Sequence, residues 1–299
     1  MSREVPLSSP QRRRSAPADR QRVYGLLMVL PSFLVICLMV VYPIARSVEL
    51  SFHDPDSHAL SFINYHQIFT EPFMVGNITY TLVVVAFTVL ITAVVSYVLA
   101  LYITFSESWV SRVIAKLYLV PRFIPTIVAV YAIMNVVKDT GAINRILSQL
   151  FHVDFKPGLM YTPQGIILAN CWFNIPFSIM LIGAGLQGIP RSVIESARDV
   201  GAGKLRVFFS MILPLSMNDF LISVTFVFMG NVASFTTPYL MGARSPMMLG
   251  VALQQEFSSF FHMEKSAAIS VLIFLLSSLM GAFYIYKSLK ANKWEVSDR

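Results

Sequence analysis

One short segment, residues 53–58, carries residue types that could hold a metal ion. His53, Asp54, Asp56 and His58 lie close together in the chain, and imidazole and carboxylate groups are ordinary metal ligands. The same segment reads Asp-Pro-Asp-Ser, a composition typical of a solvated turn. We favour the turn, and we expect no metal site in this chain.

Two glycine patterns resemble nucleotide-binding motifs but stand in the wrong context. Gly183, Gly185 and Gly188 spell GxGxxG, yet they follow an apolar run, whereas a dinucleotide site opens a helix after a strand. We interpret them as sites of close helix packing. Gly203-Lys204 ends like a phosphate-binding loop, but Leu205 stands where that loop needs Ser or Thr. We therefore expect no ATP binding and no cofactor in this chain.

No Ser/His/Asp or Cys/His arrangement falls on one predicted helix face, so nothing in the sequence indicates an enzyme. Cys37 and Cys171 lie in apolar runs and read as small buried hydrophobic residues. The net charge of +7 is not interleaved with aromatic residues on one face, so we expect no nucleic-acid partner.

The elements that must carry any function are membrane helices. The chain has 299 residues, of which 56% are hydrophobic and 13% charged, whereas soluble domains are about 25% charged. Charge-free runs of about 20 residues are long enough to cross a bilayer, so we predict an all-α polytopic membrane protein. Arg122 lies inside the third run near one end, where its long side chain can reach the interface. The six predicted spans are Val23–Ala45, Asn77–Ile103, Leu117–Val137, Pro163–Leu186, Phe220–Met241 and Ser266–Tyr286.

The distribution of basic residues predicts the orientation of these spans. Segments on the side of the N-terminus hold sixteen Lys and Arg, the opposite loops hold six, and Arg122 completes the 23. Because cytoplasmic loops are enriched in Lys and Arg, we predict that both termini are cytoplasmic. Residues 1–22 would be a basic, disordered tail before an uncleaved anchor, 23–290 the transmembrane domain, and 291–299 a second tail.

The longest inner loop, residues 188–216, holds two predicted amphipathic helices. Ser192 and Glu195 form a capping-box pattern, so the first helix should begin near Val193. Its apolar side would carry Val193, Ile194, Ala197 and Val200. Gly201 then suits the left-handed residue that ends a helix.

The second helix of this loop would place Leu205, Phe208, Phe209 and Ile212 on one face, and Pro214 would end it. Both apolar faces could lie back on the lipid interface or on the protein's own spans. They could equally dock onto a partner protein, and the pattern alone does not separate these alternatives.

The segment ESARDVGAGKLRVFFSMILPL, residues 195–215, resembles the EAA loop of binding-protein-dependent ABC importer permeases. Ser196 departs mildly from the usual Ala, and Met217-Asn218 stands near where a second Pro is often seen. The residues that match the family pattern are Glu195, Ala197, Gly201, Ala202, Ile212, Leu213 and Pro214.

Weaker similarities to this family extend from about residue 24 to residue 290. They comprise Phe62–Phe69, Pro121 with Pro125, Gly141–Asn144, the Trp172, Pro176 and Phe177 group, and Leu186, Ile189 and Pro190.

The resemblance implies a six-span, type I (MetI-like) ABC importer permease fold in a bacterial inner membrane. It implies a cytoplasmic ATP-binding subunit dimer, which would hold the ATP and Mg, and an extracytoplasmic solute-binding protein. It also implies a second homologous permease or a second copy of this chain. The loop would be the coupling helix that seats in the ATPase, through Glu195, Ser196, Ala197, Asp199, Gly201, Ala202, Leu205 and Phe208.

The order Ala-Arg-Asp-Val-Gly-Ala, with Asp199 one residue before Val200, is similar to polyamine, ferric-ion and phosphonate permeases. Sugar permeases usually carry Asp directly before the glycine. Phe235–Pro238, Leu249 and Gln254–Phe257 also look polyamine-permease-like. We predict spermidine or putrescine uptake, with phosphonate, ferric ion or sugar as alternatives. A secondary transporter would need ionisable residues near mid-membrane and half-chain repeats, whereas the predicted spans carry almost no charge and the halves do not look alike. A homo-oligomeric channel would not need the amphipathic inner loop.

Five polar residues are candidates for the translocation path. Asn135, Asn174 and Asn231 lie in or beside predicted spans, where an amide is costly if it faces lipid. Hydrogen bonds between helices are the plain alternative. Asp139 and Glu256 lie near outer span ends and could attract a cationic solute, or could be ordinary exposed loop carboxylates.

Overall fold

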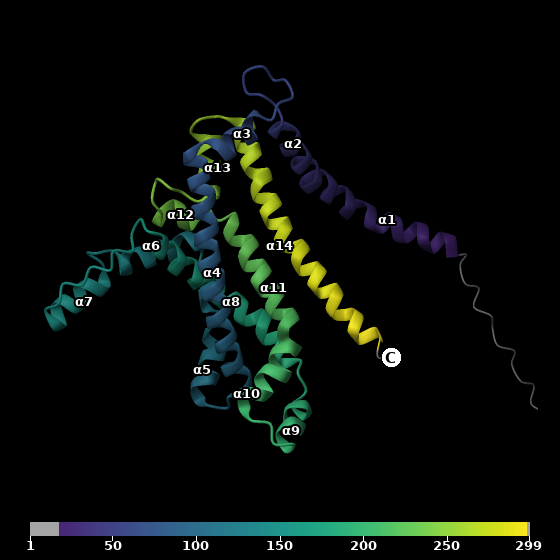
Figure 1. The fold of residues 1–299 in the computed structure, drawn as a ribbon, viewed down its shortest axis with the longest axis vertical. Coiled ribbons are helices and arrows are strands. Elements are labelled where there is room, and N and C mark those ends of the chain that lie inside the picture. The colour runs from purple at the N-terminus through teal and green to yellow at the C-terminus, as the bar shows by residue number, and fades with distance from the viewer. Residues whose placement is uncertain (1–17, 298–299) are drawn as a thin grey trace, which may run out of the picture. The chain divides into compact units, whose positions relative to one another are not determined.

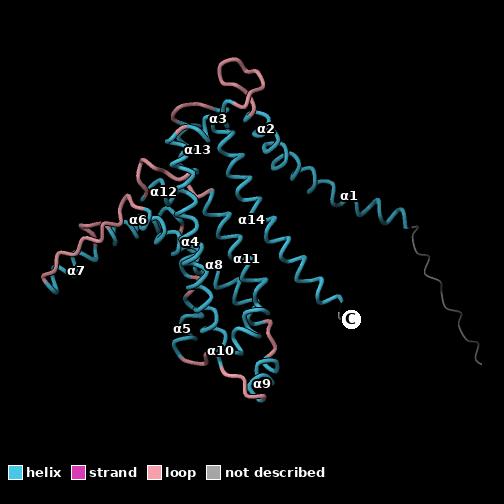
Figure 2. The backbone as a smooth tube through the Cα atoms, viewed as in Figure 1, coloured by secondary structure: helices cyan, strands magenta, loops and turns pink. Residues whose placement is uncertain are grey.

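A computed structural model describes residues 18–297, and within that range the chain forms helices and no β-strand (Figure 2). Six helical segments are long and apolar enough to cross a membrane, which confirms the predicted number of spans. They are Leu26–Ser51, Pro72–Phe105, Thr126–Phe151, Pro163–Gln187, Lys204–Val232 and Met263–Lys290.

The α-helices are α1 (Ala18–Ile36), α2 (Tyr42–Ser51), α3 (Ile63–Thr70), α4 (Pro72–Phe105), α5 (Trp109–Leu117), α6 (Thr126–Val137), α7 (Ala142–Phe151), α8 (Pro163–Gln187), α9 (Arg191–Asp199), α10 (Lys204–Val207), α11 (Leu213–Val232), α12 (Thr236–Met241), α13 (Leu249–Ser258) and α14 (Met263–Ser297). Two π-helical segments, η1 (Cys37–Val41) and η3 (Phe208–Ile212), and one 3₁₀ segment, η2 (Val120–Phe123), complete them.

The chain divides into two units, residues 1–49 and residues 50–299. The first unit holds α1, η1 and most of α2. Helix α1 begins at Ala18, five residues before the predicted start of the first span. Most of the predicted basic tail, residues 1–17, lies outside the described residues.

The second unit is built around α4 and α8, which pack along each other, with α11 packed against both (Figure 1). Small polar side chains join these helices. Ser178 on α8 and Ser223 on α11 are 2.7 Å apart, and the hydroxyls of Tyr97 and Ser216 are 2.6 Å apart. Hydroxyl pairs of this kind hold membrane helices together where apolar burial gives little net attraction. Helix α14 packs on α11 and α13.

Pro214 does not end the second loop helix, so that prediction is wrong. The helix runs from Lys204 through η3 into α11, and Leu213 donates its backbone N–H to the carbonyl of Phe208, five residues back. The wider π-helical turn accommodates the proline ring, which in an α-helix clashes with the carbonyl four residues back. Pro43 follows η1 in the same way.

The predicted fifth span, Phe220–Met241, is also misplaced. The helix starts at Lys204 and ends at Val232, and residues 236–241 form the separate short helix α12. The sequence prediction began this span after Asp219 because it avoided charge, whereas the structure holds Asp219 within α11.

The predicted third span, Leu117–Val137, is not continuous. Helix α5 ends at Leu117, η2 follows, and α6 begins only at Thr126. Pro125 forces Ile124 before it into extended backbone with ψ 125°, which breaks the helix. Arg122 therefore lies in this break.

Candidate functional site

The first helix of the 188–216 loop, α9, begins at Arg191 after an extended Pro190 that caps it without a side-chain hydrogen bond. Ser192 is therefore the second residue of the helix, and the predicted capping box with Glu195 is wrong. Pro190 is suited to this position because its fixed φ lets the chain enter the helix directly.

Gly201 ends α9 as predicted, with φ +83°. Its N–H donates to the carbonyl of Arg198 at 2.8 Å, and the N–H of Ala202 donates to the carbonyl of Ala197 at 3.0 Å. These two bonds form a Schellman motif, which satisfies carbonyls at the end of a helix and needs a left-handed residue at this position. The corner that joins α9 to α10 is the loop seen between their labels in Figure 2.

One face of α9 packs on the protein itself. Ile194 and Ala197 are buried in a cluster with Leu186 of α8, Tyr97 of α4 and Val207 of α10. The rings of Phe208 and Tyr97 meet edge to face, with centroids 6.0 Å apart. This face therefore packs on the chain's own helices, one of the alternatives that the sequence left open.

A second set of apolar side chains around the same corner has no such cover. Val200 is 85% exposed, Leu205 75% and Phe209 61%. The sequence placed Val200 with Ile194, and Leu205 with Phe208, but Val200 belongs to the end of the helix and Leu205 points away from the cluster. We call Val200 and Leu205, with exposed Glu195, Ser196 and Asp199 beside them, the corner surface.

An open depression adjoins the corner surface. Its lining joins α9 to η3, so a partner side chain inserted there would touch both helices of the loop. The lining residues are Ser192, Val193, Ser196, Ala197, Val200 and Met211.

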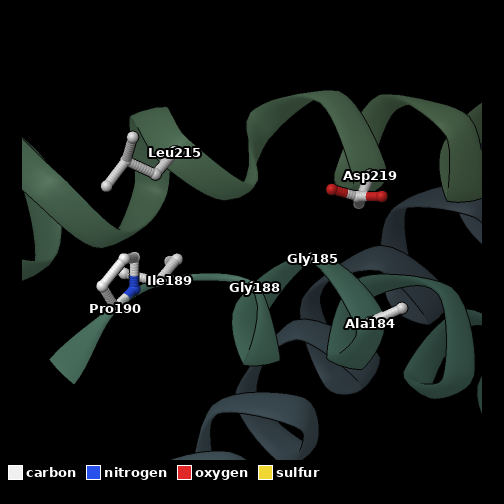
Figure 3. Close-up of a pocket in the computed structure, with 7 residues that line it drawn as sticks. All are labelled: Ala184, Gly185, Gly188, Ile189, Pro190, Leu215 and Asp219. Atoms are coloured by element: carbon white, nitrogen blue, oxygen red, sulfur yellow. The ribbon is translucent and has the colours of Figure 1, made fainter. Parts of the chain in front are cut away.

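Behind the loop, α8 and α11 approach closely at Gly185 (Figure 3). A Cβ atom added at Gly185 would lie 2.7 Å from the Cβ of Asp219, and it would also contact the Asp219 carboxylate. At Gly183 a Cβ would meet nothing within 4 Å. The close-packing interpretation of the GxGxxG pattern is confirmed at Gly185. The same contact borders a pocket lined by Ala184, Gly185, Gly188, Ile189, Pro190, Leu215 and Asp219.

Two of the candidate path residues come together. The Asn174 amide on α8 lies 3.5 Å from the Asn231 amide oxygen on α11, and each amide also donates to a carbonyl of its own helix. This is the helix-to-helix hydrogen bonding that the sequence left as an alternative.

Asn135 and Asp139 lie elsewhere, at the end of α6. Lys138 donates to Asn135 at 2.9 Å, and Asp139 accepts the backbone N–H of Gly158 at 3.0 Å. Asn135 thus makes a local contact at the end of α6, and Asp139 ties the α6–α7 loop to the connection between α7 and α8.

Glu256 is neither a free attractant nor an exposed loop carboxylate, because it is buried on α13. Its carboxylate lies 2.8 Å from Nδ1 of His262 and 3.3 Å from Nζ of Lys265. Lys265 also pairs with Glu71 at 3.1 Å, so the network ties α13 and α14 to the start of α4.

Lys265→Met should lower the stability of the folded chain by about 3 kcal/mol, because it leaves buried Glu256 without its cation. Thermal unfolding of the purified protein measures this. Lys156→Met is the matched control, since its pair with Asp154 is more than half exposed and should be worth under about 1 kcal/mol. Equal losses in the two variants would contradict the role of burial.

The candidate metal segment is a turn. Asp54 accepts the backbone N–H groups of Ser57 at 2.8 Å and Asp56 at 2.9 Å, and these bonds lower the pKa of its carboxyl. No group of three or more metal-ligating side chains occurs in the described range 18–297.

Sequence reasoning missed the environment of Arg122. Arg122 precedes the third span, Thr126–Phe151, but its guanidinium carbon lies 5.0 Å from the centroid of the Phe177 ring in the middle part of α8. The available signal was the pair Pro121 and Pro125, which opens the helix on both sides of the arginine.

Comparisons with known proteins agree with this architecture. A family model described as "Binding-protein-dependent transport system inner membrane component" matches residues 94–290. The sulfoquinovosyl glycerol transport system permease protein SmoG of Agrobacterium fabrum is 28% identical, covering 88% of this chain and 90% of that protein.

Other relatives are named for different solutes. The spermidine/putrescine permease PotB of Salmonella typhimurium is 26% identical over 61% of this chain and 63% of its own length. The sn-glycerol-3-phosphate permease UgpA of Pectobacterium atrosepticum is 27% identical over 88% of this chain and 92% of its own length.

Among solved structures, a chain of a bacterial ABC transporter involved in alginate import superposes with a TM-score of 0.78. It is 16% identical and covers 91% of this chain and 97% of its own. At this identity the likeness shows the fold.

Proposed function

Because this chain belongs to the family of binding-protein-dependent transport system inner membrane components, we propose that its 188–216 loop couples solute movement to a separate ATPase. The chain is a permease subunit of an ATP-binding-cassette importer and a multi-pass protein of the bacterial inner membrane. Its fold is the type I importer permease fold that the EAA resemblance implied.

The distribution of Lys and Arg supports an orientation with both termini in the cytoplasm. In that orientation the corner surface faces the cytoplasm, where a dimer of ATP-binding subunits would meet it. A second homologous permease, or a second copy of this chain, would enclose the path. A solute-binding protein would deliver the solute from the opposite side.

The observation that carries this proposal is the division of the loop into two faces. Ile194 and Ala197 anchor α9 to α4, α8 and α10, while Val200 and Leu205 are left exposed at the corner. An anchored element with exposed apolar residues at its tip can transmit a push from a docked protein to α8 and α11. A loop that lay on its own spans would bury Val200 and Leu205 as well.

Replacing Val200 and Leu205 together with Glu should reduce co-purification of the ATPase at least tenfold. Each apolar side chain buried in an interface contributes about 1.5–3 kcal/mol, and about 1.4 kcal/mol corresponds to tenfold in affinity. The measurement is the ratio of ATPase to permease after affinity purification of the complex through this chain.

Leu150→Glu in α7 is the control for this experiment. Leu150 is 69% exposed, a fraction similar to that of Leu205, but it lies near the end of α7, which the predicted orientation places on the other side of the membrane. It should leave the ratio unchanged. A full complement of ATPase on the double variant would exclude the corner surface as the docking site.

We also propose two classes of solute for this importer. The sequence order around Asp199 favours a polyamine, and PotB supports it. SmoG and UgpA support a sugar derivative or a glycerol phosphate equally well. The two candidate solutes are thus a polyamine and a sugar-type solute, and uptake of labelled members of each class by the reconstituted importer separates them.

A further inference from the structure

Arg122 lies at mid-depth in the protein and not at a membrane interface. Its guanidinium stacks on Phe177, which is ten residues from the Gln187 end of α8 and fourteen from the Pro163 end. At 1.5 Å per residue these separations are about 15 Å and about 21 Å. The guanidinium of Arg122 therefore lies beside the middle of the membrane-spanning helix α8.

Nothing in the described residues neutralises this charge. No carboxylate among them lies within 4.0 Å of the Arg122 side chain, and the side chain is exposed. An arginine side chain that faces lipid at the depth of the bilayer centre costs at least about 2.5 kcal/mol. Such a residue is accommodated where it faces a water-filled cavity or a partner.

The surroundings of Arg122 point to a surface for a solute. Phe177 meets Phe226 of α11 edge to face, with centroids 6.1 Å apart, and Phe226 is 55% exposed. Asn174 lies one turn along α8 from Phe177 and contacts Asn231. Arg122, Phe177, Phe226 and Asn174 thus join η2, α8 and α11 in one surface, which we call the arginine platform.

We propose that the arginine platform lines the translocation path and that Arg122 contacts an anionic solute through a sulfonate, phosphate or carboxylate group. This inference rests on the proposed function, because only a permease path supplies water and solute at this depth. The Phe177 ring holds the guanidinium by a cation–π contact and uses none of its five N–H donors. Those donors match the oxygens of an anion in a forked geometry.

The sign of the charge decides between the two solute classes. A polyamine carries several positive charges and would meet an unpaired cation at the centre of the membrane, where the low dielectric strengthens repulsion. An anion is attracted by the same group. The platform therefore favours an acidic sugar or glycerol derivative over the polyamine that the loop sequence suggests.

A ligand-independent test measures the local potential. Phe226→Cys, in a chain with Cys37 and Cys171 replaced by Ala, would be reacted in the assembled complex with an anionic and a cationic water-soluble methanethiosulfonate. We expect both reagents to label it, and we expect Arg122→Gln to lower the anionic-to-cationic rate ratio about tenfold. Arg145→Gln in α7 removes the same charge elsewhere and should not change the ratio.

Two outcomes would overturn the proposal. No labelling at Phe226→Cys would place the surface against lipid or protein. An unchanged ratio in Arg122→Gln would mean that Arg122 is neutralised by a carboxylate of a partner subunit. Both labelling readouts report on the surroundings of Phe226→Cys, whereas failure of the proposed function would appear as absence of the ATPase from the purified complex.

A transport assay then addresses the solute. Proteoliposomes with the complete importer would be offered labelled sn-glycerol 3-phosphate, sulfoquinovosyl glycerol, spermidine and maltose. We expect uptake of an anionic member, reduced at least tenfold by Arg122→Gln, less by Arg122→Lys, and not by Arg145→Gln. Uptake of spermidine or maltose by the unmodified importer would overturn the anion assignment, and if none of the four is carried the labelling ratio decides.

Discussion

Gly201→Val should abolish solute uptake while the importer still assembles. Gly201 has φ +83°, a left-handed conformation that a β-branched residue adopts only at a cost of about 1–3 kcal/mol. Its two neighbouring hydrogen bonds, from Gly201 to Arg198 and from Ala202 to Ala197, depend on that conformation. Valine would open the corner and change the position of Val200 relative to Leu205.

The transmembrane part should be unaffected by this change. A Cβ at Gly201 meets nothing within 4 Å, so the variant creates no clash and leaves the cluster around Ile194 in place. We expect normal recovery of the complex, and we expect uptake and solute-stimulated ATP hydrolysis in proteoliposomes to fall at least 100-fold.

Gly203→Val is the matched control two residues away. Gly203 has φ −66° and ψ 161°, extended backbone that valine prefers, and it also has free space at its Cβ position. It should retain at least half of the uptake. Solute-stimulated hydrolysis at the normal rate in Gly201→Val would remove the corner from the coupling mechanism.

Local patterns predicted those features of the fold that depend on one residue's own backbone. Pro163 starts α8 at the predicted residue because it has no N–H to lose at the first turn, and Thr162 caps it by accepting the N–H of Gly165. Gly201 was predictable for a similar reason, since few other residues adopt positive φ.

Features that depend on a distant partner were not predictable in this way. The rule that proline ends a helix failed at Pro214 because the preceding turn widened into a π-helix, which no residue type in the segment signals. Helical spacing predicted that Val200 and Ile194 share one apolar face. Which of them is buried depends on the positions of Tyr97 and Leu186, which pack on Ile194. The predicted fifth span excluded Asp219 because it is charged, although Gly185 of α8 leaves room for the Asp219 side chain.

The mispredictions at Arg122 and Asp219 have one physical origin. A hydropathy window treats each charge as a cost to be moved toward water. In a polytopic protein a neighbouring helix can accommodate the charge instead. The Phe177 ring of α8 does so for Arg122, and the glycine face of α8 does so for Asp219. Charges kept inside spans are therefore better starting points for function than the apolar pattern around them.

Gly185→Val should prevent recovery of a folded complex. Even the first added carbon would lie 2.6 Å from Cγ and 2.7 Å from Cβ of Asp219, and the Cβ cannot move without shifting α11. Overpacking of this kind costs about 1–3 kcal/mol and occasionally more. Valine adds two further methyl groups at the contact, so we expect a large loss of folded protein in size-exclusion chromatography.

Gly183→Val tests whether the effect belongs to this contact. It makes the same change two residues earlier in α8, where a Cβ has no neighbour within 4 Å, and should give near-normal recovery. The milder Gly185→Ala allows a double-mutant cycle with Asp219→Gly, which removes the opposing Cβ. If the α8–α11 contact is the cause, the double variant should be less destabilised in thermal unfolding than the sum of the two single variants. Strictly additive losses would mean that Gly185 matters only as a flexible point in α8, and that α9 is held against the spans by Ile194 and Ala197 alone.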